Sequence, residues 1–440
     1  MLLEFRATNY KSFKEELVFS LVPAPKQKGL DYSILKSQVE SKTYKGLCSA
    51  VIYGPNASGK TNIVGAMATF KSIVLRGNIL NKSDKNDPNT AANALELIPN
   101  NLNTDREPVF FSIKFIEEDL LVEYSFTAGL GNFLEIDYAR KILTETLRVN
   151  EKLVFSRNNG LTFDSLNHIQ GFLVNSFEQN AESLITIARN NLNDEELFLT
   201  NGFKAMFSSK LVALITNWLD KKFMVIYRAD SMHLIRKFSD PEKESIYIEN
   251  TLNEAATSFG INSNALGYVI KGEENEAKLY SLFKRPDKGV AVPAEVFESF
   301  GTLRFIDRFP LVVYALLNGG TLVVDEFDAS IHPMALMNII NIFHNDDINI
   351  HRAQLIFNTH NPIFLNSNLF RRDEIKFVER DEDTHYSIQY SLSDFGTAGK
   401  SGVRKNEDYM KNYFIDRYGA IKDVDFTPIF EKLLEKKEEV

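Results

Sequence analysis

The chain has 440 residues, of which 44% are hydrophobic and 25% charged, a composition typical of folded proteins large enough for more than one core. This composition excludes wholesale disorder and low complexity. The formal net charge of -9 argues against a surface that binds nucleic acid through overall positive charge, although a local basic patch remains compatible with it.

The cysteine content and the length of the apolar runs indicate the cellular compartment and whether the chain spans a membrane. The single cysteine, Cys48, excludes an internal disulfide and a zinc cluster built of several cysteines, as expected in a reducing compartment. The longest apolar run, Phe309–Leu317, is too short to span a membrane. Charged residues interrupt the amino-terminal segment, so it does not read as a signal peptide. We therefore expect a cytoplasmic protein without a membrane span.

The first third of the chain alternates strand and helix patterns. A strand is predicted over Leu2–Ala7 and a buried strand over Ala50–Tyr53. Helical spacing of apolar residues predicts a helix over 62–73. Two short alternating segments, 109–115 and 120–126, favour a β-hairpin. Strand, loop and helix thus follow one another directly around residue 54.

The rest of the chain changes from helical patterns back to alternating strand and helix. Residues 182–189, 194–218 and 248–259 have helical periodicity. After residue 290 the sequence predicts a helix over 301–318 and, later, a helix opened by Pro333. Two strands, Thr321–Val324 and Gln354–Asn358, are expected there as well.

A glycine-rich segment follows the buried strand at 50–53. Residues 54–61 match the phosphate-loop pattern G-x-x-x-x-G-K-T. Its glycines let the backbone fold tightly, so that successive N–H groups and the start of the next helix face a phosphate. Lys60 is expected to reach the β- and γ-phosphates, and the Thr61 hydroxyl to bind Mg2+. We assign nucleotide binding to Gly54, Pro55, Asn56, Ala57, Ser58, Gly59, Lys60, Thr61 and Asn62.

A second apolar strand, Thr321–Val324, ends in the two carboxylates of Asp325 and Glu326. Asp325 is predicted to hold Mg2+, because hard cations prefer oxygen ligands. Glu326 is predicted to polarise the attacking water. An acidic pair after a strand is also common as solvated loop charge, so the assignment depends on the phosphate loop in the same chain. Both segments should end at one edge of a parallel sheet.

Two further groups are candidates for the same site. Ser299, Gly301 and Thr302 open a helix one element before the acidic strand, where a hydroxyl and free amides can meet an anion. The simpler interpretation of Ser299 is a helix cap. His360 follows the strand at 354–358, and its imidazole is predicted to donate to a γ-phosphate oxygen.

In this order the motifs resemble the ABC-type ATPase heads of the RecF and SMC class, and within that class bacterial AAA-type proteins of the abortive-infection and OLD-like kind. The resemblance rests on the segments 9–13, 54–61, 299–302, 323–328, 330–333 and 357–361. Three carboxy-terminal blocks, 372–379, 390–395 and 417–421, extend it. It implies an α/β fold, an ABC-type ATPase head with a mixed sheet, an antiparallel β lobe and an inserted helical subdomain.

The resemblance also implies a division of the chain and of the site. The expected parts are an amino-terminal ATPase lobe with phosphate loop and β subdomain (1–175), a helical insertion (176–290), a carboxy-terminal ATPase lobe (291–395) and a tail (396–440). Two copies would sandwich ATP and Mg2+, with Lys60, Thr61, Asp325, Glu326 and His360 from one copy. Ser299, Gly301 and Thr302 would come from the other copy, and Asp328 would couple the two sites.

The resemblance leaves three functions to weigh. The first is an ATPase that forms a homodimer or larger homo-oligomer around ATP and controls a separate effector, a Toprim-type nuclease or other toxin, in anti-phage defence. We expect a separate effector because the residues after His360 offer no convincing nuclease metal cluster; Asp381–Asp383 reads as a solvated turn. The second is a RecF-like, DNA-binding repair ATPase that uses basic residues of the helical region, namely Lys204, Lys210, Lys221, Lys222, Arg228, Arg236 and Lys237. The third is a scaffold that hardly turns nucleotide over.

Overall fold

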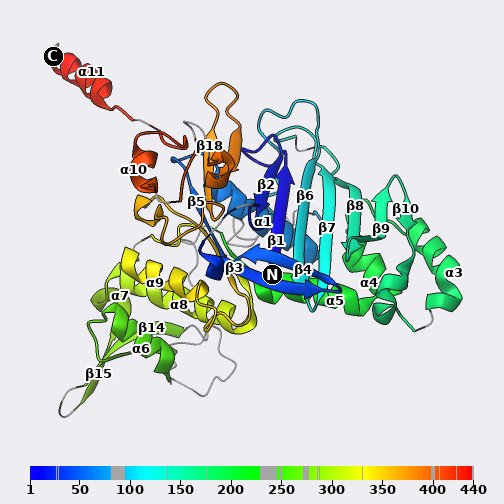
Figure 1. The fold of residues 1–440 in the computed structure, drawn as a ribbon, viewed down its shortest axis with the longest axis horizontal. Coiled ribbons are helices and arrows are strands. Elements are labelled where there is room, and N and C mark those ends of the chain that lie inside the picture. The colour runs from blue at the N-terminus through cyan, green and yellow to red at the C-terminus, as the bar shows by residue number, and fades with distance from the viewer. Residues whose placement is uncertain are drawn as a thin grey trace.

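The computed structural model describes residues 1–25, 27, 29–80, 95–135, 137–175, 177–227, 245–247, 250–270, 277–284, 286, 288–329, 331–397, 402–405, 407–422 and 424–438. Two large sheets dominate these residues, with helices on their faces (Figure 1). No helix among them is long and apolar enough to cross a membrane.

The first sheet is antiparallel and has seven strands in the order β10-β9-β8-β7-β6-β1-β2. Its strands are β1 (Leu2–Thr8), β2 (Leu17–Ser20), β6 (Val109–Glu117), β7 (Leu120–Gly129), β8 (Lys141–Val149), β9 (Lys152–Asn158) and β10 (Leu161–Phe163). A separate hairpin joins β3 (Ile34–Val39) to β4 (Lys42–Leu47). The predicted first strand and the predicted hairpin are therefore confirmed.

The second sheet has six strands in the order β11-β16-β17-β5-β18-β19 and is parallel except for its last pair. Its strands are β5 (Ser49–Tyr53), β11 (Phe223–Ile226), β16 (Thr321–Val324), β17 (Gln354–Asn358), β18 (Ile375–Arg380) and β19 (Ser387–Ser391). Because β5, β16 and β17 pair in parallel, their carboxyl ends share one edge. The predicted strands at 50–53, 321–324 and 354–358 are all confirmed.

Helix α1 (Lys60–Arg76) fills the space between the two sheets. Its apolar residues pack in one core with β1 and β6 of the antiparallel sheet, and with one face of β5 through Ala50 and Ile52. The other face of β5, with Val51 and Tyr53, belongs to a second core. A strand buried on both faces reads as a continuous apolar run, as the sequence 50–53 does.

The second core lies under the helices of the carboxy-terminal half. These are α8 (Phe300–Asn318), which ends at Gly319 in the left-handed conformation, and α9 (Pro333–Phe343), with proline in its first turn. A shorter helix, α10 (Tyr409–Phe414), adds Tyr409 to the same core. Both predicted helices of this half are confirmed.

The region 176–290, expected as a helical insertion, is not one helical unit. Helices α3 (Phe177–Asn190), α4 (Lys204–Met206) and α5 (Ser209–Asn217) pack into the first core through Ala188, Met206 and Leu211. The next segment, β11, is a strand of the parallel sheet. Helical periodicity was visible, but whether a helix packs on its own or against a distant sheet depends on contacts that local sequence does not encode.

The described residues between 245 and 297 form a further small unit of sheet and helix. Its four antiparallel strands are β12 (Ser245–Tyr247), β13 (Ala265–Ile270), β14 (Ala277–Lys284) and β15 (Gly289–Pro293), and its helices are α6 (Asn250–Phe259) and α7 (Ala294–Phe297). Leu252, Leu266 and Ile306 join this unit to α8 in a small core of their own. The helix predicted at 248–259 is confirmed as α6.

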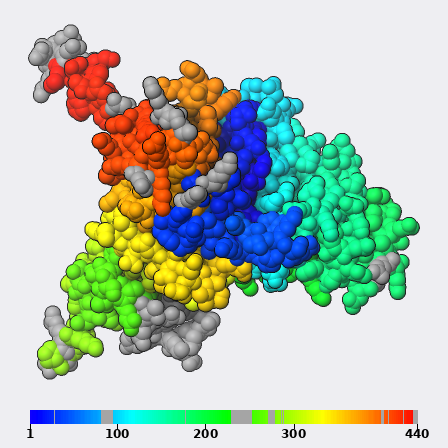
Figure 2. Space-filling view, viewed as in Figure 1, coloured from blue at the N-terminus to red at the C-terminus, as the bar shows by residue number. Residues whose placement is uncertain are grey.

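The last helix, α11 (Thr427–Glu438), stands clear of the body (Figures 1 and 2). Large apolar residues at 426, 429, 430, 433 and 434 are each more than half exposed. We find nothing in the described residues that covers them.

We predict that Trp218→Ala destabilises the whole protein, because the Trp218 ring is 1% exposed and stacks on Phe115 of the antiparallel sheet at 3.8 Å. Replacing a buried tryptophan by alanine costs about 3–5 kcal/mol. Chemical denaturation followed by circular dichroism should show a lower midpoint for a single transition, whereas the exposed Phe414→Ala should change little. An early, separate transition with the main one unmoved would mean that the helical region folds independently.

Candidate functional site

The loop between β5 and α1 is shaped by left-handed backbone conformations. Gly59 has φ +114°, and Ala57 has φ +64°. A Cβ at Gly59 would lie 2.5 Å from Ser387 Oγ and 2.8 Å from Ser12 Oγ, so a side chain here would be both strained and obstructed. The glycine pattern of the sequence therefore has a direct steric cause.

Two serines from distant parts of the chain hold this loop in place. The Ser387 hydroxyl of β19 donates to the Ser58 carbonyl oxygen at 2.5 Å. Asn62, in the first turn of α1, donates its amide to Ser12 Oγ at 2.7 Å, and the Ser387 N–H donates to the Ser12 carbonyl oxygen. Sequence reasoning missed both serines as supports, since their role appears only once the strands are assembled.

The Lys60 ammonium is buried against the loop it follows. Its Nζ donates to the carbonyl oxygens of Gly54 (2.7 Å) and Pro55 (2.9 Å), and the residue is 6% exposed. Desolvation lowers the pKa of Lys60 to about 8, against the opposing attraction of Glu326 and Asp325. A cation held in this way gains from any anion that enters the loop.

The carboxylate of Asp325 is the meeting point of three elements. Thr61 Oγ1 of α1 donates to Asp325 Oδ1 at 3.1 Å, and Asn358 Nδ2 at the end of β17 donates to the same oxygen at 2.5 Å. Asn358 Oδ1 accepts from the Glu326 N–H. Sequence analysis placed Thr61 and Asp325 together correctly, but it gave Asn358 no role.

Glu326 is held in a special backbone conformation. Its φ is +49°, in the left-handed region that non-glycine residues rarely adopt. Arg308 of α8 donates to the carbonyl oxygens of Glu326 (2.9 Å) and Phe327 (2.6 Å), which fixes the turn after β16. Strain of this kind concentrates at functional sites, where surrounding contacts enforce it.

His360 and Asp328 lie on the same edge. Thr359 donates to Asp328 Oδ2 at 2.6 Å, and burial raises the pKa of Asp328. The pKa of His360 is lowered, first by desolvation and then by the positive charge of Lys60. A neutral imidazole at pH 7 keeps one ring N–H for donation and one lone pair for acceptance.

Ser299 lies at the start of α8, where it is exposed. Ser299 caps α8 by accepting from the Thr302 N–H at 3.1 Å, and the two hydroxyls lie 2.8 Å apart. These contacts stay within its own helix, so the cap interpretation of Ser299 holds in this chain. Next to it, Val296 (76%) and Phe300 (60%) are exposed. The structure thus brings Lys60, Thr61, Asp325, Glu326 and His360 to one edge, and the described hydrogen bonds of Ser299 and Thr302 reach none of them.

A cavity of about 480 Å³ adjoins the first turn of α1. Its lining includes Lys11, Ser12, Asn62, Glu96 and Arg380. Lys11 donates to Glu96 and, at 3.0 Å, to the hydroxyl of Tyr227. Because Asn62 directly follows the phosphate loop, this cavity adjoins that loop.

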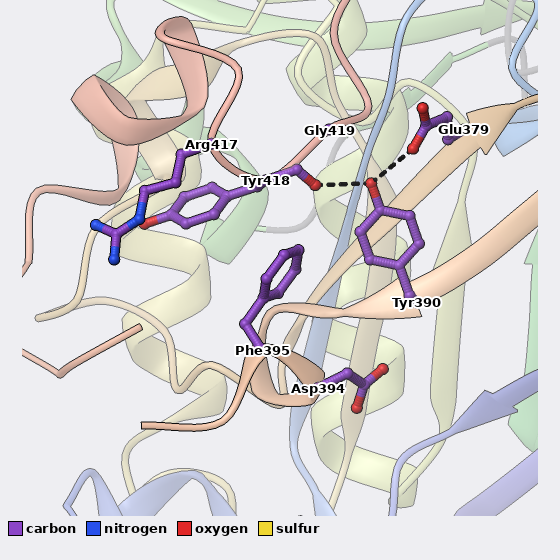
Figure 3. A pocket seen from close by; sticks show the side chains of 7 residues that line it. All are labelled: Glu379, Tyr390, Asp394, Phe395, Arg417, Tyr418 and Gly419. Carbon is purple, nitrogen blue, oxygen red and sulfur yellow. Dashed lines mark hydrogen bonds between the residues drawn. The ribbon is translucent and has the colours of Figure 1, made fainter. Parts of the chain in front are cut away.

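A second cavity of about 440 Å³ is formed by the carboxy-terminal blocks noted in the sequence (Figure 3). Tyr390 donates its hydroxyl toward the Tyr418 carbonyl oxygen (2.7 Å) and Glu379 Oε2 (3.1 Å), and Phe395 forms a wall. No phosphate-loop residue lines it. This cavity is therefore distinct from the candidate nucleotide site.

The part of the chain that carries this geometry matches a known protein family. Residues 49–366 match a family described as "AAA domain, putative AbiEii toxin, Type IV TA system". The match covers more than half of the chain. The chain belongs to this family. The residues of this AAA domain discussed above, from Gly54 to His360, all lie inside the matched range.

Among solved structures, this AAA domain protein is similar to one titled "Crystal structure of the SmcHead bound to the C-winged helix domain of ScpA". The identity is 11%, the TM-score is 0.40, and the match covers 90% of this chain and 99% of that chain. No curated protein matches the chain.

We predict that Lys60→Met changes how stability depends on pH. Below pH 8 Lys60 is charged in both the folded and the unfolded wild type, and its burial destabilises the folded state. Between pH 8 and 10.5 the unfolded chain binds more protons at Lys60 than the folded chain does. The free energy of unfolding of the wild type therefore rises with pH in this interval. The free energy of unfolding of Lys60→Met relative to wild type should therefore fall by about 1–3 kcal/mol across this interval.

Urea denaturation at pH 7 and pH 10 measures this difference. The exposed Lys210→Met serves as the matched control and should run parallel to wild type. Parallel behaviour of Lys60→Met as well would contradict the placement of a desolvated ammonium at this position.

Proposed function

We propose that this chain binds ATP with Mg2+, hydrolyses it between two copies of itself, and thereby controls a separate effector protein in bacterial anti-phage defence. The observation that carries the proposal is the convergence on one sheet edge of the Lys60 ammonium, the Thr61 hydroxyl and the Asp325 carboxylate. The residues proposed to bind ATP and Mg2+ are the phosphate loop with Asn62, the group of Ser299, Gly301 and Thr302, Asp325, Glu326 and His360, as expected from the sequence. Membership of an AAA domain family agrees with this chemistry.

The residues present fit both ligands. Thr61 Oγ1 and Asp325 Oδ1 lie 3.1 Å apart, and such oxygens are the ligands that Mg2+ prefers. Lys60, whose ammonium faces two loop carbonyls, would exchange them for phosphate oxygens and regain a full countercharge. Mg2+ bound here would neutralise phosphate charge. The cavity beside Asn62 would take the rest of the nucleotide.

Two residues are proposed for the hydrolysis itself. Glu326, fixed by Asn358 and Arg308, would orient and polarise a water. His360, kept neutral by its surroundings, would donate its ring N–H to the γ-phosphate. The chain's own residues would thus hold the phosphates and orient and polarise the attacking water. These tasks are most of what phosphoryl transfer requires from a protein.

The proposal of a shared site rests on the exposed start of α8. Ser299 and Phe300 are exposed there, where helix N–H groups can meet an anion. The Ser299 hydroxyl accepts from the Thr302 N–H in this structure, and Thr302 is buried, so both hydroxyls would have to turn toward the ligand. In a homodimer or larger homo-oligomer these groups would meet the ATP held by another copy. Because both copies would contact the γ-phosphate, ATP would bind the closed dimer much more tightly than the open one. Hydrolysis would remove this difference in affinity.

A separate effector, such as a Toprim-type nuclease or another toxin, is proposed on two grounds. The family description names a toxin and a toxin–antitoxin system. Asp381, which heads the acidic turn before β19, accepts hydrogen bonds from the Asp383 and Thr384 N–H groups, and Glu382 and Asp383 are exposed, as in an ordinary turn. The DNA-binding alternative has less support: Lys222 is paired with Glu117 at 2.6 Å, and Arg228 and Arg236 lie outside the described residues.

Mixing two inactive variants tests the shared site. Lys60→Ala should abolish nucleotide binding, and Ser299→Arg should abolish ATPase activity while leaving the phosphate loop intact. In a mixed dimer one composite site is whole, with Lys60 from one copy and Ser299 from the other. We expect ATPase activity to return on mixing, measured as phosphate release. No recovery would favour a site contained in one chain.

Glu326→Gln should lower kcat by about 100-fold or more, because a neutral amide cannot act as the base, while ATP binding is retained. Size-exclusion chromatography with light scattering should show that ATP shifts this variant to a dimer or larger species. Normal turnover by Glu326→Gln would refute the assigned role. Absence of phosphate release from the wild type would instead support the scaffold hypothesis.

A third measurement addresses the effector. The product of the neighbouring open reading frame, co-expressed with this protein, should copurify with it, and its association should differ between Lys60→Ala and Glu326→Gln. Stimulation of wild-type ATPase activity by duplex DNA at moderate salt, without such a partner, would favour the repair alternative.

A further inference from the structure

The six-stranded sheet has a second polar cluster at the edge opposite the phosphate loop. Cys48 directly precedes β5, His344 caps the end of α9, and Glu374 directly precedes β18. One ligand atom from each side chain, the Cys48 sulfur, a His344 ring nitrogen and a Glu374 carboxylate oxygen, lies within 4.8 Å of the other two. All three residues are buried, at 0%, 3% and 0% exposure.

Hydrogen bonds satisfy this cluster only in part. The Ser49 hydroxyl donates to Glu374 Oε1 at 2.6 Å and lies 2.9 Å from His344 Nε2, which is 3.2 Å from the same carboxylate oxygen. His344 Nδ1 is buried, and within the described residues it has no hydrogen-bond partner. Buried polar atoms without a partner are rare in native proteins and call for an explanation.

The Glu374 carboxylate is held by hydrogen bonds from Ser49 and from the backbone rather than by a paired guanidinium or ammonium group. Its other carboxylate oxygen accepts from the Arg371 N–H at 2.8 Å, while the Arg371 guanidinium is paired with Asp373. In the part of the chain that the structure describes, no lysine or arginine side chain forms an ion pair with Glu374. An isolated buried carboxylate is costly unless a cation or proton neutralises it.

We propose that Cys48, His344 and Glu374 form a zinc site. A thiolate, an imidazole and a carboxylate are the three ligand types that proteins use for Zn2+. Ligand atoms of a tetrahedral zinc ion lie roughly 3.5 Å apart, so side-chain shifts of about 1 Å suffice to close the cluster. The Ser49 hydroxyl, already against two of the ligands, is the nearest oxygen for the remaining position.

Zinc would join three side chains that hydrogen bonds connect only in part. It would place a positive charge beside the Glu374 carboxylate and bind the Cys48 sulfur and one ring nitrogen of His344. Burial and the Glu374 charge raise the pKa of the Cys48 thiol, so zinc uptake must displace its proton. Because the cluster joins β5, α9 and β18, bound zinc would stabilise the fold, and this role is independent of the proposed ATPase activity.

Metal analysis of the full-length protein tests the site. Wild type purified without chelator should contain about one zinc ion per chain, measured by inductively coupled plasma mass spectrometry. Cys48→Ser and His344→Gln should each lose it, whereas the exposed His351→Gln should retain it. Zinc far below one per chain in wild type after refolding with excess zinc would overturn the proposal, as would full retention in Cys48→Ser.

A second measurement covers the case in which the variants fail to fold. Wild type refolded with Co2+ should show thiolate-to-cobalt charge-transfer absorption, which reports on Cys48 directly because the chain has no other cysteine. Added Zn2+ should abolish this band. Wild type that refolds to the native circular dichroism spectrum with Co2+ present but shows no such band would overturn the site.

Discussion

The parallel register of β5, β16 and β17 is the constraint on which the candidate nucleotide site depends. It brings the phosphate loop, the acidic pair and Asn358 to one edge, where Thr61 and Asn358 both donate to one oxygen of Asp325. Thr61 and Asp325 are 264 residues apart in the chain. A slip of the register would separate all three at once, since every pair in the sheet would shift together.

The site is also where local preferences conflict with stability. The Lys60 ammonium is largely buried, and the Glu326 backbone has a left-handed φ. Gly59 lies against the hydroxyls of two serines. None of these choices stabilises a protein without ligand. Violations of this kind concentrate where a protein has a function, and the surrounding sheet supplies the stability that maintains them.

The sequence predicted three of the six strands of the second sheet and the side chains that the structure brings to its carboxyl edge. Apolar runs such as 321–324 and helical spacing in 62–73 are local signals, and the phosphate loop has a fixed spacing. Ser12, Ser387 and Asn358 were not predicted to act here, because ordinary polar residues acquire a role only through the neighbours that the fold provides. The region 176–290 differed from expectation for the same reason: β11 is a strand because β16 lies beside it.

The same elements connect the two polar edges of the sheet. β5 begins at Ser49, beside the proposed zinc ligands, and ends at the phosphate loop; α9 begins after His332, near Asp328, and is capped by His344. Both run through the second core, where close packing leaves little room for independent movement. Fixing β5, α9 and β18 at one edge would therefore limit how far the loop and the acidic turn can shift at the other. On this argument, the amino-terminal edge contributes positional accuracy to the phosphate site, and the chemistry stays at the carboxyl edge.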